Sequence, residues 1–332
     1  MAKTPAKKNA AAANRAQGRP SGASASRKAP NRPPVKASSG RPAGLFTWLA
    51  VGLVVVVVAT LVIIKVSGGG SGPSSASGFT ATDPAMVAQL TTIPESVFDT
   101  VGVTSQVVQV SAPIAIKGQP PLTGTTASGA KVPEILYIGA EYCPFCAAQR
   151  WATIIAMSRF GTWSNLGNMT SAAKDSYPNT PTFTFVKAVY KSKYLAFKSV
   201  EEYTNQVNAA DTNYVTLQNP TAAEEKLILK YDTPKYIHGL TSSSGNPIPF
   251  MTFDNKFLVS GASYSPDTLT GLTRSAIATG LSDPTSPVTD AIITSANYQT
   301  AAICSLTKDQ PSNVCTSSGV QAAAKAMKLK LK

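Results

Sequence analysis

Two cysteines separated by two residues are the part of this sequence whose residue types and spacing point most directly to chemistry. The motif reads Cys143-Pro144-Phe145-Cys146 and precedes a stretch with helical spacing of apolar residues. A cysteine at a helix N-terminus faces unpaired backbone N–H groups and the positive end of the macrodipole, which together lower the pKa of the thiol. We therefore expect Cys143 to be an exposed attacking thiolate and Cys146 to be the shielded resolving thiol of a disulfide-exchange site.

Zinc ribbons use the same cysteine spacing, so a metal site is the competing interpretation. A tetrahedral zinc site would need a second close pair of ligands. Cys304 and Cys315 lie far downstream and too far apart in sequence for such a pair. The single histidine, His238, excludes any site that needs two histidines, and we expect it to be structural. We predict no metal ion and no cofactor.

The elements that must position the motif can be read from the flanking residues. Residues 135–139 form a short apolar run, which is typical of a strand buried on both faces and ends just before the motif. Pro144 suits the first turn of the following helix, where its missing N–H costs nothing. Further along, residues 250–253 and 257–260 predict two strands joined by a tight turn at Asp254-Asn255. The pattern predicts an α/β fold.

The segment ILYIGAEYCPFC resembles the strand and active-site segment of the thioredoxin superfamily. The resemblance implies a thioredoxin-like fold with a cis proline that faces the two cysteines, and Pro249 is the residue that matches it. In that family the residue before the cis proline, here Ile248, offers backbone groups to the substrate chain. We expect Ile248, Pro249, Pro144 and Phe145 to contact the substrate.

The sequence more closely resembles an uncharacterised family of membrane-anchored thioredoxin-like proteins of actinobacteria and archaea, the domain of unknown function 929. The resembling segments are GAEYCPFCAAQRWATIIAMSRFGTW, YPNTPTFTF, SPDTLTG and AAICSLTKDQPSNVC. Together they span most of residues 94–316. This second resemblance implies the same fold and says little about the substrate.

One departure from the thioredoxin pattern concerns proton transfer. Many members of that superfamily carry a buried acid six residues before the first cysteine, where this sequence has Tyr137. Proton transfer to and from Cys146 must therefore use another group. Glu141 and water are the candidates.

A second departure is the long stretch between Cys146 and Pro249, which exceeds that of a minimal thioredoxin. Residues 182–190 are strand-like, whereas residues 221–231 have helical spacing with two glutamates in the first turns. We predict an insertion of mostly helical character, which could shape a substrate groove or cap the site.

Two residues directly after the motif carry different expectations. Trp151 is expected in the core. Arg150 is either a solvated charge or a group that biases the electric field at the thiolate, and the sequence alone leaves both interpretations open.

Cys304 and Cys315 bracket the sequence SLTKDQPSNV between two predicted C-terminal helices, of which the first starts at Ser286-Pro287. We expect a structural disulfide that ties these helices together, with a loop whose closure contributes about 3 kcal/mol. A second redox pair that relays electrons to or from Cys143 and Cys146 is the alternative. The structural interpretation is favoured because redox-active pairs are usually closer in sequence and sit at helix starts.

The N-terminal part of the chain reads as a membrane anchor. Residues 1–43 hold ten basic residues and no acidic ones, with almost no large apolar residues, and are expected to be a disordered tail. Within residues 44–66, twenty consecutive uncharged residues are long enough to cross a bilayer. A cleaved signal peptide and a buried core helix are the alternatives, and the length and composition of the run argue against both. The positive-inside rule keeps the tail in the cytoplasm and exports the remainder.

The exported part is divided by composition. Residues 67–78 are a Gly/Ser linker, residues 79–324 an extracytoplasmic thioredoxin-like domain with C-terminal helices, and residues 325–332 a basic tail. Between residues 66 and 324 the chain carries 15 basic and 17 acidic residues, so the pI of about 9.6 describes its ends. We therefore do not expect the folded part to bind nucleic acid.

These observations predict a single-pass membrane protein whose outer domain is a thiol–disulfide oxidoreductase acting on exported proteins. Its expected partners are exported protein thiols or disulfides, the lipid bilayer, and a membrane or soluble electron partner. Oxidase, isomerase and reductase directions are all compatible with the motif. The alternative is a non-catalytic partner-binding module on a thioredoxin fold, with the Cys143–Cys146 pair a structural bridge.

Overall fold

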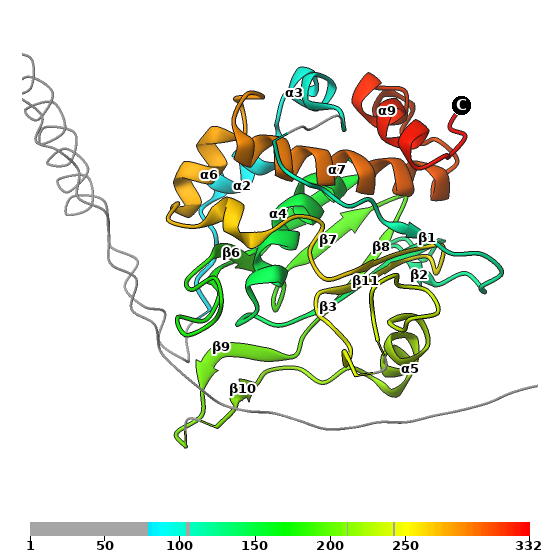
Figure 1. Ribbon diagram of the computed structural model, residues 1–332. Coiled ribbons are helices and arrows are strands. Elements are labelled where there is room, and N and C mark those ends of the chain that lie inside the picture. The colour runs from blue at the N-terminus through cyan, green and yellow to red at the C-terminus, as the bar shows by residue number, and fades with distance from the viewer. Residues whose placement is uncertain (1–78, 104–106, 211, 242) are drawn as a thin grey trace, which may run out of the picture. The chain divides into compact units, whose positions relative to one another are not determined.

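The computed structural model describes residues 79–103, 107–210, 212–241 and 243–332 (Figure 1). The predicted basic tail, membrane anchor and linker all lie outside these residues. Within the described ranges no helix combines the length and the apolar character that a membrane crossing requires. The predicted membrane span therefore remains a prediction from sequence.

The central sheet is built around β3 (Lys131–Gly139), the strand that leads to the two cysteines. On one side, β11 (Phe250–Phe253), β12 (Phe257–Ser260) and β1 (Ile114–Ala115) follow in that order, each antiparallel to its neighbour. On the other side, β2 (Thr123–Thr125) pairs antiparallel with the start of β3, and β8 (Ala196–Glu201) pairs parallel with the remainder. The carboxyl ends of β3 and β8 therefore lie side by side.

Alternating residues of β3 face two different layers of helices. Ile135 and Tyr137 belong to a large core that includes α4 (Pro144–Ser158) and α7 (Pro287–Leu306). Leu136 and Ile138 belong to a second, smaller core on the other face, which includes α5 (Ala222–Tyr231). Figure 1 shows α4 and α7 on one side of the sheet and α5 on the other. The period-two alternation explains why residues 135–138 are all buried.

Shorter helices complete the layer around α7. These are α2 (Pro84–Thr91), α3 (Glu95–Val101), the 3-10 helix η1 (Pro266–Leu269), α6 (Arg274–Gly280), α8 (Ser312–Cys315) and α9 (Ser318–Ala326). The buried side chain of Asn297 on α7 donates to the carbonyl of Phe98 on α3 at 2.9 Å. Cys304 near the end of α7 is bonded to Cys315 at the end of α8, which confirms the predicted disulfide between helices.

The insertion between α4 and β11 differs from expectation. Apart from α5, its regular elements in the described residues are strands. Three antiparallel pairs occur: β4 (Gly161–Ser164) with β7 (Val189–Ser192), β5 (Gly167–Thr170) with β6 (Pro181–Thr184), and β9 (Tyr203–Val207) with β10 (Tyr214–Thr216). The prediction of a mostly helical insertion was therefore wrong. Strands of three to five residues are too short to show a clear period-two pattern in sequence.

The elements that flank the cysteines agree with the sequence prediction. α4 begins at Pro144, and the hairpin strands β11 and β12 have the predicted bounds. Asp254 and Asn255 both have φ of 52°, the left-handed conformation that a tight two-residue turn requires. The mixed α/β class is confirmed, and these elements bring the motif and the residues before β11 together.

Candidate active site

Cys143 occupies the N-cap position of α4, so its sulfur lies at the start of the helix. The backbone N–H of Cys146 donates to Cys143 Sγ at 3.2 Å. Pro144 is the first helical residue, which leaves the remaining N–H groups of the first turn directed toward the cap. The helix start therefore supplies both a hydrogen bond and a positive potential to this sulfur.

The two cysteines are free thiols with opposite shifts in pKa. A hydrogen bond from the Cys146 thiol is the main cause that lowers the pKa of Cys143; burial opposes it, and backbone N–H groups and Arg150 add to it. Cys146 is fully buried, and burial raises the pKa of its thiol well above the usual value. The thiol of Cys143 is therefore the more readily ionised of the pair, and burial keeps the thiol of Cys146 protonated.

A cis peptide bond between Ile248 and Pro249 lies opposite the helix start. The carbonyl oxygen of Ile248 is 3.6 Å from Cys143 Sγ, and the Pro249 carbonyl accepts from the N–H of Gly261 at 2.9 Å. The structure thus brings the predicted Ile248-Pro249 pair to the motif across 105 residues of sequence. Cys143 is only 5 % exposed, less than expected, because the segment carrying Ile248 lies against its sulfur.

The other two residues predicted to contact substrate differ in exposure. Pro144 is buried within the first turn of α4. Phe145 is 40 % exposed, and its ring meets the edge of Tyr177 with centroids 5.8 Å apart. Phe145 therefore presents an apolar surface next to Cys143, whereas Pro144 shapes the helix start.

A buried ion pair beneath the motif was not predicted. Arg150 on α4 and Glu201 at the end of β8 are both fully buried, with 2.5 Å between Nη2 and Oε2. Arg150 also donates to the carbonyl of Ala140 at 2.8 Å. Burial alone would lower the pKa of Arg150, but the adjacent Glu201 raises it, so the guanidinium stays charged. Of the two interpretations left open for Arg150, the structure excludes the solvated charge.

Nothing in the sequence marked Glu201 as part of this site, because it is 51 residues away from Arg150 along the chain. The parallel pairing of β8 with β3 brings the carboxylate to the motif. Trp151, by contrast, is fully buried as predicted, and its indole N–H donates to the carbonyl of Pro181 at 2.9 Å.

Glu141, the proposed proton-transfer residue, lies in the loop between β3 and α4 and is 5 % exposed. Burial raises the pKa of its carboxyl group to about 7, against a hydrogen bond with Thr184 that lowers it. The charges that act on it are those of Glu201 and Arg150. Its carboxyl group is thus hydrogen-bonded to β6 and lies within the electric field of the buried ion pair.

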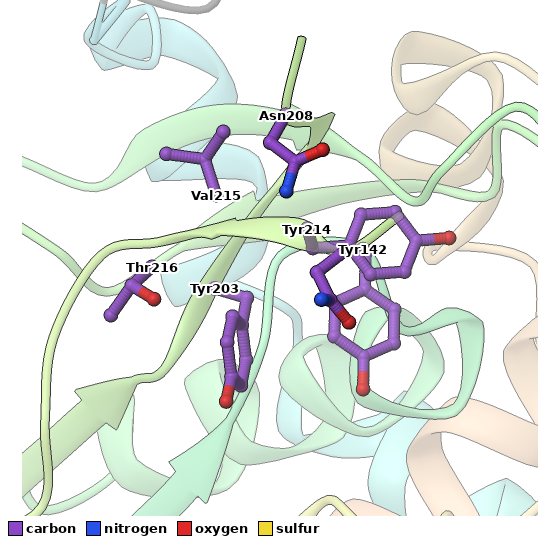
Figure 2. Close-up of a pocket in the computed structure, with 7 residues that line it drawn as sticks. Tyr142, Tyr203, Asn208, Tyr214, Val215 and Thr216 are labelled. Carbon is purple, nitrogen blue, oxygen red and sulfur yellow. The ribbon is translucent and has the colours of Figure 1, made fainter. Parts of the chain in front are cut away.

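Beside Cys143, three tyrosines border a hollow of about 750 Å³, shown in Figure 2. The rings of Tyr142 and Tyr214 stack with centroids 4.0 Å apart, and Tyr203 lies 6.2 Å from Tyr142. The remaining lining residues come from the β9–β10 hairpin: Asn208, Asn213, Val215 and Thr216. Tyr142, which lines this hollow, is the residue directly before Cys143 in the sequence. The sequence prediction missed the hollow.

A second hollow, of about 340 Å³, is lined in part by Ile248. Its other lining residues come from α5 and the segments around it: Glu202, Pro220, Glu225, Ile228, Leu229 and Asn246. Both hollows therefore include a residue in contact with, or adjacent to, Cys143.

The remaining cysteines bear on the zinc alternative. Cys304 and Cys315 are fully buried and bonded to each other, with Cα atoms 5.6 Å apart. They are therefore not available as thiolate ligands for a metal bound at Cys143 and Cys146. Across the described ranges, no group of three or more metal-binding side chains comes together.

Comparison with known proteins places the chain in a family but supplies no activity. No curated protein and no solved structure matches it. A family model with the description "Domain of unknown function (DUF929)" matches residues 123–305, which is more than half of the chain. The matched range extends from β2 almost to the end of α7 and contains Cys143, Cys146 and Ile248. The protein therefore belongs to the DUF929 family.

Proposed function

We propose that this protein is a membrane-anchored, extracytoplasmic thiol–disulfide oxidoreductase that acts on exported proteins. The observation that carries the proposal is the asymmetric pair of free thiols at the start of α4. Cys143 has a lowered pKa, Cys146 is buried with a raised pKa, and the carbonyl of Ile248 lies over the nucleophile. Thiol–disulfide exchange needs this combination of a ready thiolate and a protected neighbouring thiol.

The reaction proceeds in two steps. The thiolate of Cys143 attacks one sulfur of a substrate disulfide, forming a mixed disulfide and releasing the other substrate sulfur as a thiol. Cys146 then attacks Cys143, its proton passes to the departing substrate sulfur, and a Cys143–Cys146 disulfide forms. The substrate disulfide has gained two electrons from the cysteine pair, one proton from Cys146, and one proton from water, which protonates the first sulfur released. The reverse sequence oxidises a substrate dithiol, and an electron partner restores the starting state of the pair.

The thioredoxin-like fold is supported by the order of the elements around the cysteines. A parallel β3–α4–β8 unit is followed by the antiparallel hairpin β11–β12 and then by α7. The helices α4 and α7 cover one face of the sheet, and α5 covers the other. With a cis proline before the hairpin, this arrangement is the one that the resemblance to thioredoxins implies.

A polypeptide substrate fits the surroundings of Cys143. One hollow begins at Tyr142, and another begins at Ile248, so a chain whose sulfur reaches Cys143 has neighbouring space for its flanking residues. The exposed ring of Phe145 adds an apolar contact. Aromatic side chains supply large contact areas at low entropic cost, which suits binding of varied protein segments.

Two features support a location outside the cytoplasm. The twenty-residue apolar run within residues 44–66 and the basic residues before it predict an N-terminus in the cytoplasm. The Cys304–Cys315 disulfide suits an oxidising compartment, since such bonds are rare in the cytosol.

The direct test is catalysis of insulin reduction and of scrambled ribonuclease reactivation by the full chain purified in detergent. We expect turnover with dithiothreitol or glutathione as the source of electrons. Cys143→Ser should abolish this turnover, and Cys146→Ser should leave a stable mixed disulfide at Cys143, detected by mass spectrometry.

The opposite result would favour the non-catalytic alternative. If turnover survives Cys143→Ser, or if the wild-type chain never shows it, the protein is a partner-binding module and the cysteine pair is a structural bridge. In that case the Cys146→Ala variant would trap no mixed disulfide with an exported protein in cells.

A further inference from the structure

Tyr137 carries a buried hydroxyl group that nothing in the proposed reaction uses. Its side chain is fully buried on β3, and within the described ranges its Oη has no hydrogen-bond partner. A buried polar atom without a partner is unfavourable, so native proteins retain few of them without a functional reason.

The hydroxyl group of Tyr137 and the thiol of Cys146 border the same small space. Gly139 lies two residues after Tyr137 on β3 and therefore faces the same side of the sheet. A methyl group on Gly139 would overlap the Tyr137 hydroxyl oxygen and would lie 3.0 Å from Cys146 Sγ. The absence of a side chain at Gly139 is thus what lets these two groups approach each other.

The phenol of Tyr137 stays protonated because it is buried. Burial raises the pKa of Tyr137 well above 10; Arg150 lowers it, while Cys146, Glu201 and Cys143 raise it. The hydroxyl group is therefore a hydrogen-bond donor at neutral pH. Both cysteines act on Tyr137, whereas the charges that act on Glu141 are those of Glu201 and Arg150.

We infer that Tyr137 donates a hydrogen bond to the sulfur of Cys146 when that sulfur becomes negatively charged. The inference rests on the proposed function. In the free dithiol, the Cys146 thiol donates to the Cys143 thiolate, which is the main cause of the lowered pKa there. Once Cys143 is bonded to substrate, that acceptor is gone and Cys146 must lose its proton to attack.

At this step the Tyr137 hydroxyl group supplies a hydrogen bond to the sulfur of Cys146. The proton of Cys146 passes to the departing substrate sulfur, the Cys143–substrate bond breaks, and the Cys143–Cys146 bond forms. Tyr137 keeps its own proton throughout and stabilises the developing charge on Cys146 Sγ. The Arg150 guanidinium, which also lowers the pKa of Cys146, acts in the same direction.

The experiment follows the reaction of the reduced full chain with dithiobis(nitrobenzoate) by stopped flow. The first coloured thiolate reports attack by Cys143, and the second reports attack by Cys146 on the mixed disulfide. We expect Tyr137→Phe to slow the second phase by about tenfold or more and to shift its pH midpoint upward, because hydrogen bonds to charged groups are the strong ones. The first phase should change little.

Tyr264→Phe is the matched control. Tyr264 is also almost fully buried, and its hydroxyl donates to the carbonyl of Ala148 on α4 at 2.7 Å. Burial is the cause of its raised pKa, and neither cysteine contributes. Loss of this hydroxyl should lower stability while leaving both phases unchanged.

A ring-fluorinated tyrosine at position 137 keeps the hydroxyl and makes it a stronger donor. We expect it to shift the pH midpoint of the second phase downward, and it tests the inference even if Tyr137→Phe does not fold. A second phase that is unchanged in both variants would overturn the role of Tyr137. A wild-type chain that shows no second phase would instead overturn the proposed function.

Discussion

Cys143 and Cys146 carry the same side chain, and the pKa values of their thiols shift in opposite directions because of the position that each sulfur has on α4. The sulfur at the N-cap accepts the backbone N–H of Cys146 at 3.2 Å, so its thiolate is stabilised. The sulfur one turn later lies in the core beside Arg150 and Tyr137, where burial opposes ionisation. A difference of one helical turn thus gives the two thiols opposite shifts in pKa.

At the residue scale, Glu141 makes folding stability depend on pH. Burial raises the pKa of this carboxyl group from 4.5 to about 7, so the folded state holds its proton more tightly than the unfolded state. Its contribution to stability is fully present below pH 4.5 and is lost as the pH rises through 7. We expect Glu141→Gln to unfold in urea like the wild type at pH 4 and to be more stable by about 3 kcal/mol at pH 8.

The comparison with wild type at each pH cancels the contributions of all other titrating groups. A stability difference for Glu141→Gln that stays constant between pH 4 and pH 8 would contradict this prediction.

At the scale of elements, the β9–β10 hairpin contacts the two residues that directly precede Cys143. It leaves the end of β8, and the carbonyl of Tyr203 accepts the N–H of Glu141 at 2.9 Å, which ties the hairpin to the loop before α4. The stacking of Tyr214 on Tyr142 joins β10 to the residue directly before Cys143. Figure 1 shows the hairpin extending beyond the central sheet.

If this hairpin binds the substrate chain, its loss should affect large and small substrates differently. We expect Tyr214→Ala to raise KM for a protein disulfide by about fivefold to tenfold, because aromatic anchors contribute a kilocalorie or more to binding. Its reaction with glutathione disulfide, which has no extended polypeptide chain to bind along the hairpin, should stay within about twofold of wild type.

Tyr298→Ala on α7 is the control, since that tyrosine is also half-buried and belongs to no hollow around Cys143. An equal loss with both substrates in Tyr214→Ala would mean that the hairpin supports the geometry of Cys143 and does not bind the substrate.

At the scale of the whole molecule, the C-terminal helices complete the large core. Helix α7 packs on α4, and α9 packs on both α3 and α7, so the chain returns from the end of the sheet to cover α4. The Cys304–Cys315 bond joins α7 to α8 within this layer. Its burial separates it from solvent, which favours the structural role over a relay of electrons.

We expect the double variant Cys304→Ser/Cys315→Ser to lose about 3 kcal/mol of unfolding free energy, measured by urea denaturation, with insulin reduction unchanged when corrected for the folded fraction. Removing both cysteines avoids leaving one reactive thiol. A fall in turnover without a loss of stability would instead identify this pair as a second redox centre.

Local sequence patterns were enough to predict the start of α4, the β11–β12 hairpin and the Cys304–Cys315 bond. In each case a few neighbouring residues impose the conformation: proline in a first helical turn, Asp254-Asn255 in a tight turn, and two cysteines across a short loop. The same patterns failed in the insertion, whose short strands depend on pairing with each other more than on their own residues.

The partners of Arg150 and Tyr142 could not be predicted in this way. Glu201 reaches Arg150 only because β8 pairs with β3, and Tyr214 reaches Tyr142 only because the hairpin folds back toward the motif. Such contacts arise between residues far apart in the chain, and burial then sets their electrostatics. The residue types near Cys143 were therefore enough to predict thiol–disulfide chemistry. Its charged and aromatic neighbours depend on the tertiary structure, because desolvation and distance are properties of the packed molecule.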